Sequence, residues 1–314
     1  MKIVFMGTPD YAAVTLEKLI ESDHEIAGVF AQPDKPVGRK QILTPPPVKV
    51  TAEKHGIPVY QPNTLRDGEA LSILKGINPD IIVVVAYGKI LPEEILTLPK
   101  YGCVNGHASL LPKYRGASPI QWCIVCGEEK TGVTVMKMDV GMDTGDILTQ
   151  CEVEIGETET AEELFDRLSV ISADLMLETI DNIENITPVK QNDEEATYAP
   201  IIKKEMALLD FSKSAKELYN AVRGYYSWPV AFFFLNGKRI KVIKSEIGNE
   251  TSKPAGTVVG NTECLEIACG DGKTLKLLTV QPEGKGQMTA KQMLNGTKIE
   301  KGTNVYGKCS KNGG

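Results

Sequence analysis

The segment PDIIVVVAYG, residues 79–88, is an almost unbroken apolar run that ends in a glycine. A short run that is apolar at nearly every position is typical of a strand buried on both faces of a parallel sheet. Such sheets occur in α/β proteins, where helices cover both faces. This segment therefore predicts a parallel sheet inside an α/β domain.

Strand and helix signals alternate through the first 150 residues. Residues 2–7 form a short apolar run that ends in glycine. Residues 8–22 have helical apolar spacing, with Thr8 as the expected N-cap and Pro9 at the first helical position. Further strands are predicted at residues 24–32, 101–107 and 131–139. This order predicts a doubly wound, mostly parallel sheet.

The pattern changes in the second half of the chain. Residues 160–183 predict a long amphipathic helix, and the polar segment TPVKQNDEEATYAP, residues 187–200, predicts a linker. After one more helix, short apolar runs are separated by the turn signals LNGK and GDGK. These strands predict a small open β-barrel. The expected boundaries are a catalytic domain at residues 1–187, a linker at 188–206 and a C-terminal barrel at 207–314.

The composition is that of an ordinary globular protein. The chain has 314 residues, 42% of them hydrophobic and 24% charged, which suits two domains. No stretch approaches the roughly 20 apolar residues that cross a membrane. The N-terminus lacks the apolar region and cleavage site of a signal peptide. We therefore expect a cytoplasmic monomer with no membrane partner.

Seven cysteines are scattered along the chain, and this odd number does not suggest a disulfide framework. Cys123 and Cys126 form a C-x-x-C pair, but no second pair completes a zinc site. We expect both to pack in a helix, with redox or metal chemistry as the alternative. The sequence gives no reason to expect a metal elsewhere.

Charge is unevenly distributed. Residues 207–314 contain 16 Lys and Arg against 9 Asp and Glu, a balance of +7, whereas the rest of the chain has 19 against 32, a balance of −13. A basic C-terminal part on an acidic body predicts a polyanionic partner, above all nucleic acid. On charge alone, a lysine-rich surface that only faces solvent is the simpler alternative.

Polar residues follow two of the predicted strands. Asn105 and His107 end the strand at residues 101–107, and the segment DVGMDTGDIL, residues 139–148, follows another strand. Ligands of doubly wound sheets bind beyond the carboxyl ends of the strands. We therefore expect Asp143 to lie close to Asn105 and His107.

Asn105 and His107 share one face of an extended strand. Two hydrogen-bond donors on one face can stabilise the oxyanion that develops on a carbonyl, and Asp143 can orient the imidazole. The three residues fit acyl transfer to an amine brought by a substrate, without a covalent enzyme intermediate. The residues alone leave two alternatives open, in which His107 is a structural histidine or Asp143 and Asp146 only brace a glycine-rich turn.

The segments NGHASLLPKYRGASPIQW (105–122) and TGVTVMKMDVGMDTGDIL (131–148) resemble the signature of the folate-dependent formyltransferases. The resemblance extends over essentially residues 1–300. It implies a Rossmann-like catalytic domain followed by an OB-like, tRNA-binding barrel. It also implies the formyl donor 10-formyltetrahydrofolate and an acceptor, the α-amino group of methionine on initiator methionyl-tRNA.

By position, the resemblance assigns the catalytic roles to Asn105, His107 and Asp143. It assigns the folate site to the SLLP motif, which is Ser109, Leu110, Leu111 and Pro112. Gly106 departs from the family, whose members commonly carry a larger apolar residue between Asn and His. A side chain at this position would point away from the site.

The loop at residues 31–49 is long for a connection between a strand and a helix, and such loops are commonly functional. It carries several prolines and the charged residues Asp34, Lys35, Arg39, Lys40 and Lys49. The resemblance places this loop against the acceptor arm of tRNA, with Arg39 and then Lys40 as the contacting residues. A solvated, mobile loop is the alternative.

The second half offers a basic surface for the nucleic acid backbone. The candidates are Lys203, Lys204, Arg223, Lys238, Arg239, Lys241 and Lys244. Trp228 and the run from Phe232 to Phe234 can act as stacking platforms for bases, but so apolar a segment favours core packing.

Two other functions remain open. A formyltransferase with the same chemistry can act on a small-molecule amine, either a purine precursor or an amino-sugar nucleotide. The purine enzymes resemble only the N-terminal part of the chain, and the sugar enzymes usually carry a second nucleotide-binding domain. The other alternative is a non-catalytic RNA-binding protein, against which the intact Asn105, His107 and Asp143 argue.

Overall fold

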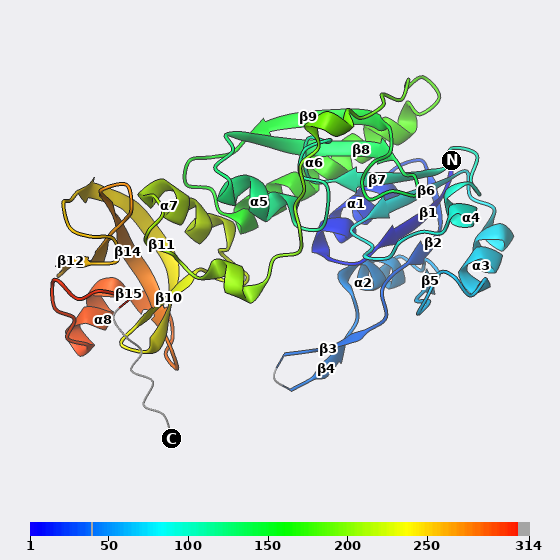
Figure 1. Ribbon diagram of the computed structural model, residues 1–314. Helices are drawn as coiled ribbons and strands as arrows, with labels where there is room; N and C mark the ends of the chain where they lie inside the picture. Colours follow the sequence, from blue (N-terminus) through cyan, green and yellow to red (C-terminus); the bar gives the residue numbers. More distant parts are fainter. Residues whose placement is uncertain (39, 307–314) are drawn as a thin grey trace. The chain divides into compact units, whose positions relative to one another are not determined.

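The computed structural model describes residues 1–38 and 40–306, which form two compact units (Figure 1). The first unit comprises Met1–Pro119, Lys130–Glu154 and Phe165–Ala199. The second comprises Ile120–Glu129, Ile155–Leu164 and the chain from Pro200 on. The second unit therefore includes two short segments that precede residue 165. The consecutive boundaries at residues 187 and 206 stay a prediction.

A seven-stranded sheet forms the centre of the first unit, in the order β5-β2-β1-β6-β7-β8-β9. Its strands are β1 (Lys2–Gly7), β2 (Glu25–Phe30), β5 (Val59–Tyr60), β6 (Ile81–Val85), β7 (Cys103–His107), β8 (Lys130–Lys137) and β9 (Ile147–Glu154). The strands from β5 to β7 pair in parallel, whereas β8 and β9 pair antiparallel. Every residue of β6 is buried, which confirms the parallel strand predicted from its apolar run.

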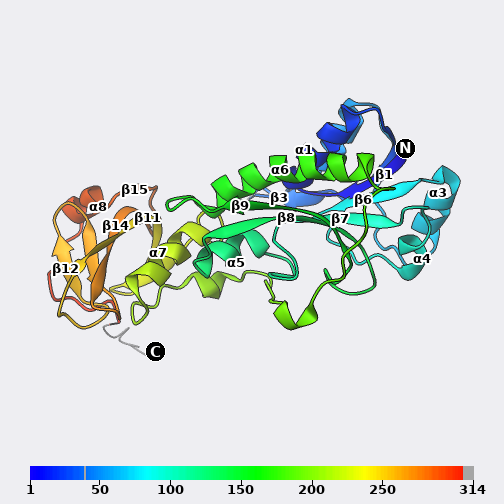
Figure 2. The same ribbon diagram turned by 90° about the horizontal axis from the view of Figure 1, so that it is seen from above.

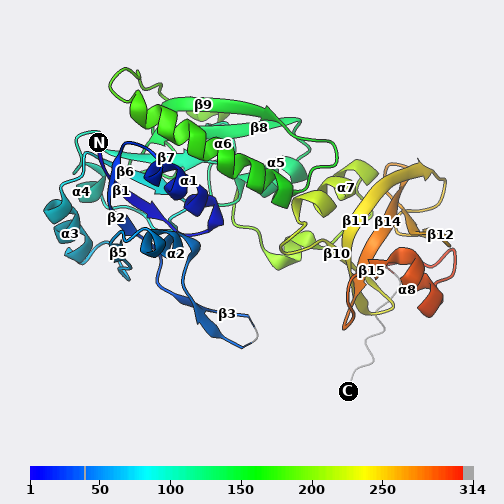
Figure 3. The same cartoon turned by 180° about the vertical axis from the view of Figure 1, so that it is seen from behind.

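Helices cover both faces of this sheet (Figures 2 and 3). On one face, α3 (Glu69–Ile77) and α4 (Glu93–Leu96) pack in a core with residues of β1 and β6. On the other face, α1 (Asp10–Ile20) and α6 (Ala161–Asp181) are joined by the hydroxyl of Tyr11, which donates to the carbonyl of Leu168 at 3.2 Å. The helix α2 (Pro47–Lys54) contacts α1. The doubly wound, mostly parallel architecture is therefore confirmed. Within residues 1–38 and 40–306, no helix combines the length and apolarity needed to cross a membrane.

Helix α1 begins one residue later than predicted, and Thr8 is not its N-cap. The N-cap is Pro9, which has no side-chain capping bond. The Thr8 hydroxyl instead donates to the carbonyl of Tyr87 at 3.1 Å. Thr8 therefore ties the first loop to the chain that leaves β6.

The second unit is built on an antiparallel sheet in the order β10-β11-β14-β13-β12, with β15 beside β14. Its strands are β10 (Phe232–Leu235), β11 (Lys238–Glu250), β12 (Val258–Asn261), β13 (Leu265–Ala268), β14 (Lys273–Pro282) and β15 (Met288–Thr289). Register shifts between β11 and β14 mark bulges, which bend strands, and the sheet curls into an open half-barrel (Figure 1). The helices α7 (Ala215–Gly224) and α8 (Ala290–Gly296) pack against it. This confirms the predicted small barrel.

The predicted hairpin turn LNGK joins β10 to β11. Asn236 and Gly237 have φ values of 50° and 75°, as a two-residue turn between twisted strands requires.

A small apolar cluster explains why residues 120–129 belong to the second unit. Trp122 and Val125 of α5 (Pro119–Val125) pack against Ile202, Ala207 and Tyr225.

Candidate active site

Strand β7 presents Asn105 and His107 on one face of the first sheet. Side chains alternate between the two faces of a strand, so Gly106 faces the opposite side. A Cβ atom at Gly106 would lie 3.0 Å from Ser172 Oγ and 3.3 Å from Met176 Cε, both on α6. Position 106 therefore points away from Asn105 and His107, as predicted, and toward α6.

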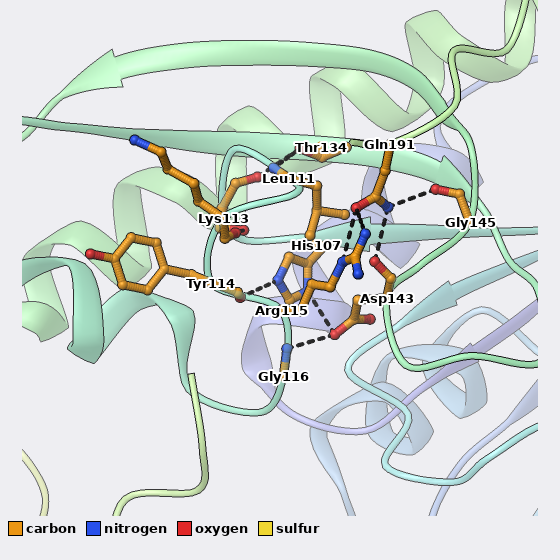
Figure 4. A network of polar contacts seen from close by, with 11 residues as sticks. His107, Leu111, Lys113, Tyr114, Arg115, Gly116, Thr134, Asp143, Gly145 and Gln191 are labelled. Atoms are coloured by element: carbon orange, nitrogen blue, oxygen red, sulfur yellow. Dashed lines mark hydrogen bonds and ion pairs between the residues drawn. The ribbon is translucent and has the colours of Figure 1, made fainter. Parts of the chain in front are cut away.

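The imidazole of His107 has polar partners at both nitrogens (Figure 4). Nε2 lies 2.9 Å from the carbonyl oxygen of Tyr114, and it must be the donor because a carbonyl only accepts. Nδ1 lies 3.7 Å from Oδ2 of Asp143, which is beyond hydrogen-bond distance but within ion-pair range. The side chains of His107 and Asp143 are only 7% and 18% exposed. The structure thus brings these two residues together, while their catalytic roles stay a prediction.

The path of the chain from β8 to Asp143 differs from the one that the sequence predicts. β8 runs antiparallel to β7, so Lys137 at the end of β8 pairs with Val104, near the start of β7. The loop at residues 138–146 therefore begins about 10 Å from His107 along the strand, at roughly 3.3 Å per residue. The expectation that two carboxyl ends meet here is wrong, because the β8–β9 loop must fold back toward His107.

The backbone of Asp143 is in the left-handed region, with φ of 54°, which is costly for a residue other than glycine. Its carboxylate Oδ2 accepts a hydrogen bond from the backbone N–H of Gly116 at 2.8 Å. The side-chain amide of Gln191 donates to the carbonyls of Asp143 at 2.9 Å and Gly145 at 2.7 Å. The neighbouring Asp146 is exposed, and its carbonyl accepts a hydrogen bond from the end of β8. Asp143 is therefore the aspartate of this loop that faces His107.

Arg115 and Gln191 complete this network and are absent from the predicted site residues. Arg115 donates from Nε and Nη2 to Oε1 of Gln191, at 3.0 and 2.7 Å, and from Nη2 to Asp193 at 2.8 Å. Gln191 belongs to the segment predicted as a linker, but the part of that segment up to Ala199 packs within the first unit. Arg115 lies within the segment NGHASLLPKYRGASPIQW (105–122), and this position in the motif is a signal that could have identified it. The buried Gln191 has no such signal, because it resembles its polar neighbours.

The SLLP motif forms a tight loop after β7. Ser109 and Leu111 are buried, and the Ser109 hydroxyl donates to the carbonyl of Lys113 at 2.6 Å. Leu110 and Pro112 are partly exposed. Ser109 and Leu111 therefore shape the loop, and Leu110 and Pro112 are the two whose side chains can reach a ligand. The folate role of all four residues stays a prediction.

No activated thiol lies on this strand. Burial raises the pKa of the Cys103 thiol to about 12, so it is not a thiolate at neutral pH. Cys123 is buried in α5 and Cys126 is exposed just after it, and neither is in a disulfide bond. Among the described residues, no group of three or more His, Cys, Asp or Glu is placed to hold a metal ion.

The loop at residues 31–49 forms a hairpin of β3 (Lys35–Val37) and β4 (Ile42–Thr44) (Figure 1). Arg39, the first predicted tRNA contact, lies outside the described residues, and Lys40 is exposed. Lys49 is held at the base of the hairpin. Its Nζ lies 3.0 Å from both oxygens of Asp34 and 2.9 Å from Oε1 of Gln61.

The basic candidates of the second unit divide into exposed and buried residues. Lys203, Lys204 and Arg239 are exposed. Arg223 is buried and donates to the carbonyls of Gly156 at 3.1 Å and Glu159 at 2.9 Å. The prediction that Arg223 contacts a phosphate is therefore wrong, since its guanidinium is used inside the unit.

The phenylalanine run on β10 alternates between core and surface. Phe233 is buried edge-on against Phe211, with ring centroids 5.6 Å apart. Phe234 is exposed, Phe232 is partly buried, and the two rings meet edge-on at 5.8 Å. The guanidinium carbon of Arg239 lies 5.9 Å from the centre of the Phe232 ring. Core packing, expected for the whole run, holds fully for Phe233 and not for Phe234.

Comparisons with known proteins cover both units. Residues 1–180 match the family described as formyl transferase, and residues 201–298 match the formyl transferase C-terminal domain. The methionyl-tRNA formyltransferase of Alkaliphilus oremlandii is 50% identical over 311 residues, which cover 98% of this chain and 100% of that protein.

Solved structures share the fold. The sugar 3N-formyl transferase WlaRD, solved in the presence of dTDP and 5-N-formyl-THF, gives a TM-score of 0.67 at 21% identity and covers 91% of this chain and 99% of its own. The methionyl-tRNA formyltransferase from Clostridium thermocellum gives a TM-score of 0.58 at 23% identity, with 91% and 100% covered.

Proposed function

This chain belongs to the formyl transferase family, and from this premise we propose that it transfers a formyl group from 10-formyltetrahydrofolate to the α-amino group of methionine on initiator methionyl-tRNA. The observation that carries the proposal is the pair of His107 and Asp143, on the same face of the sheet as Asn105, in a chain whose residues 207–314 are basic. The acceptor implies action in the cytoplasm, and we propose that the chain acts as a monomer.

The proposed reaction proceeds without a covalent enzyme intermediate. The amine nitrogen forms a bond to the formyl carbon, and the formyl oxygen becomes an oxyanion. The amide of Asn105 and the imidazole of His107 donate hydrogen bonds to this oxygen. The bond from the carbon to folate N10 then breaks, and N10 keeps the electron pair. The proton that the amine loses passes by way of the Asp143 carboxylate to N10, so atoms and charges balance.

The contacts of His107 suggest which nitrogen acts on the substrate. Nε2 is already bound to the Tyr114 carbonyl, so Nδ1 is the remaining donor when the ring is protonated. Nδ1 faces the Asp143 carboxylate, with Oδ2 at 3.7 Å. Asp143 would therefore both orient His107 and receive the proton of the attacking amine.

For the tRNA, exposed cations on both units are the proposed contacts. They are Lys40 on the β3–β4 hairpin and Lys203, Lys204 and Arg239 in the second unit, with Arg39 retained from the sequence. The exposed ring of Phe234 and the partly exposed ring of Phe232 lie beside Arg239, which suits an unpaired base next to a phosphate.

The decisive test is formylation of charged initiator tRNA. The protein is incubated with initiator methionyl-tRNA and 10-formyltetrahydrofolate, and the released amino acid is identified by mass spectrometry. We expect formylmethionine only when the folate is present. Product on a ribonucleotide amine or an amino-sugar nucleotide would instead support the small-molecule function. Tight tRNA binding without product would support the binding protein.

The role of His107 predicts a large loss of turnover in His107→Ala. Removal of one oxyanion donor costs on the order of 10²–10³ in kcat, and we expect this loss with a retained fold, checked by circular dichroism. The control is His55→Ala, which removes an exposed imidazole that pairs with Glu17 at 2.9 Å in the same unit. Turnover of His107→Ala close to that of His55→Ala would refute the role.

A further inference from the structure

Three consecutive residues support the two partners of the proposed acid–base pair (Figure 4). The carbonyl of Tyr114 accepts the hydrogen bond of His107 Nε2, and the N–H of Gly116 binds the carboxylate of Asp143. Arg115, between them, points its guanidinium at Gln191. Tyr114 and Gly116 therefore hold the pair directly, whereas Arg115 acts through another side chain.

The orientation of the Gln191 amide follows from its neighbours. Two N–H groups of Arg115 face one end of the amide, which must be the oxygen. The carbonyls of Asp143 and Gly145 face the other end, which must be the NH₂ group. Gln191 and Arg115 are only 5% and 2% exposed. A buried amide with each end matched in this way has a single orientation.

The two carbonyls that Gln191 holds bracket a strained segment. Asp143 has a left-handed backbone conformation, which costs an L-residue roughly 1–2 kcal/mol. Such a conformation persists only where the surroundings specify it. The Gln191 amide binds the backbone of this residue, and the Gly116 N–H binds its side chain. Without the amide, the backbone can relax and move the carboxylate away from His107.

We propose that Gln191 is a positioning residue for the formyl transfer, and that Arg115 sets the orientation of its amide. Gln191 touches no reacting atom and acts by keeping Asp143 in the backbone conformation that faces His107. The inference rests on the proposed function for its effect on catalysis. It assigns a role to a residue of the segment at 187–200, for which the sequence predicted only a linker.

The test compares Gln191→Glu with Asp193→Asn. Gln191→Glu keeps an oxygen toward Arg115 but replaces the NH₂ donor by an oxygen that faces two carbonyls. We expect kcat to fall about 10- to 100-fold, because a misplacement of about 1 Å can cost 10²-fold, with KM for both substrates within about threefold. Asp193→Asn removes the negative charge of the other partner of Arg115. The Asp193 side chain is 75% exposed, and we expect kcat within about twofold of wild type.

A merely structural role is excluded by combining Gln191→Glu with Asp143→Asn. If Gln191 acts through the Asp143 carboxylate, the double variant has nearly the kcat of Asp143→Asn alone. The proposal would be overturned if the losses of kcat in the two single variants multiplied in the double variant. It would also be overturned if Gln191→Glu had the kcat of wild type. If Gln191→Glu does not fold, Gln191→Met, of similar length and without hydrogen-bonding groups, takes its place in the same comparison.

A second readout separates this inference from the proposed reaction. The Gly116 amide donates to the Asp143 carboxylate, so its hydrogen exchange reports whether that carboxylate is in place. We expect faster exchange of this amide in Gln191→Glu and unchanged exchange in Asp193→Asn. A wild-type protein that does not formylate tRNA would refute the proposed function alone. Unchanged Gly116 exchange in Gln191→Glu would refute the positioning role, whatever the reaction.

Discussion

At the scale of single residues, the surroundings of Gly106 show that β7 packs closely against α6, on the face opposite Asn105 and His107. A Cβ atom at this position would lie 3.0 Å from the hydroxyl oxygen of Ser172, which is tighter than ordinary contact. A larger residue at position 106 would require the side chains of Ser172 and Met176 to move. Ser172 and Met176 occupy the space beside Gly106.

We expect Gly106→Ala to lower the free energy of unfolding by about 1 kcal/mol, because overpacking costs roughly 1–3 kcal/mol and the lost chain entropy offsets part of it. In a Ser172→Ala background the cost should fall by about 0.5 kcal/mol or more. Urea denaturation of the two single variants and the double variant measures this coupling. Gly76→Ala, at a helical glycine with open space around it, is the control and should be neutral or stabilising. Additive costs for positions 106 and 172 would contradict the packing argument.

At the scale of elements, the β3–β4 hairpin is held by a polar cluster at its base. Asp34 precedes β3, Lys49 lies on α2 after β4, and Gln61 follows β5. Gln61 binds Asp34 at 2.8 Å and the carbonyl of Gln32 at 2.8 Å, while Lys49 binds both Asp34 and Gln61. The cluster therefore ties the two ends of the hairpin segment to the parallel sheet. Lys49, one of the charged residues of the loop at residues 31–49, is used inside this anchor.

Asp34→Asn should lower Tm at pH 7. Hydrogen bonds from Gln61 and then Lys49 hold the pKa of Asp34 below its ordinary value. A carboxyl group with a lowered folded pKa stabilises the fold above the unfolded value of about 3.9, and this contribution is lost as pH falls through the folded pKa. We therefore expect the Tm difference between wild type and Asp34→Asn to shrink as pH falls below about 4, measured by differential scanning fluorimetry.

The matched control for this pH series is Asp174→Asn, which breaks an exposed pair with Lys18 at 2.7 Å. Exposed pairs contribute little, so its Tm at pH 7 should lie closer to wild type than that of Asp34→Asn. A Tm difference for Asp34→Asn that stays constant from pH 7 to pH 3 would show that its carboxylate charge does not anchor the hairpin.

At the scale of the whole molecule, charge and structure divide the chain in different ways. The basic balance of +7 begins at residue 207, but the second unit also contains Ile120–Glu129 and Ile155–Leu164. Not every cation of the basic part is available to a partner, because Arg223 is buried and bonded to the second of those segments, Ile155–Leu164. The exposed cations of the second unit, which can meet a polyanion, include Lys203, Lys204 and Arg239.

Binding of initiator methionyl-tRNA should weaken as salt rises, since each phosphate contact releases counterions. We expect Arg239→Ala to lower the slope of log Kd against log salt concentration by about one, and the double variant Lys203→Ala/Lys204→Ala to lower it by about two. Fluorescence titration at several salt concentrations measures these slopes. Lys18→Ala, which removes an exposed lysine of the first unit, is the control. Slopes equal to wild type in all variants would remove these residues from the tRNA interface.

The sequence by itself determined the elements and the chemistry that they can carry. The apolar run of β6 predicts a doubly covered parallel strand, and the turn residues Asn236 and Gly237 predict a hairpin, because both signals are local. The two-residue spacing of Asn105 and His107 likewise predicts a shared face. Only the tertiary structure decided how Asp143 reaches His107, because β8 runs antiparallel and strand direction is not encoded in the strand's own pattern. It also decided that a polar glutamine, Gln191, is buried, since burial of a polar group depends on partners that are distant in the chain.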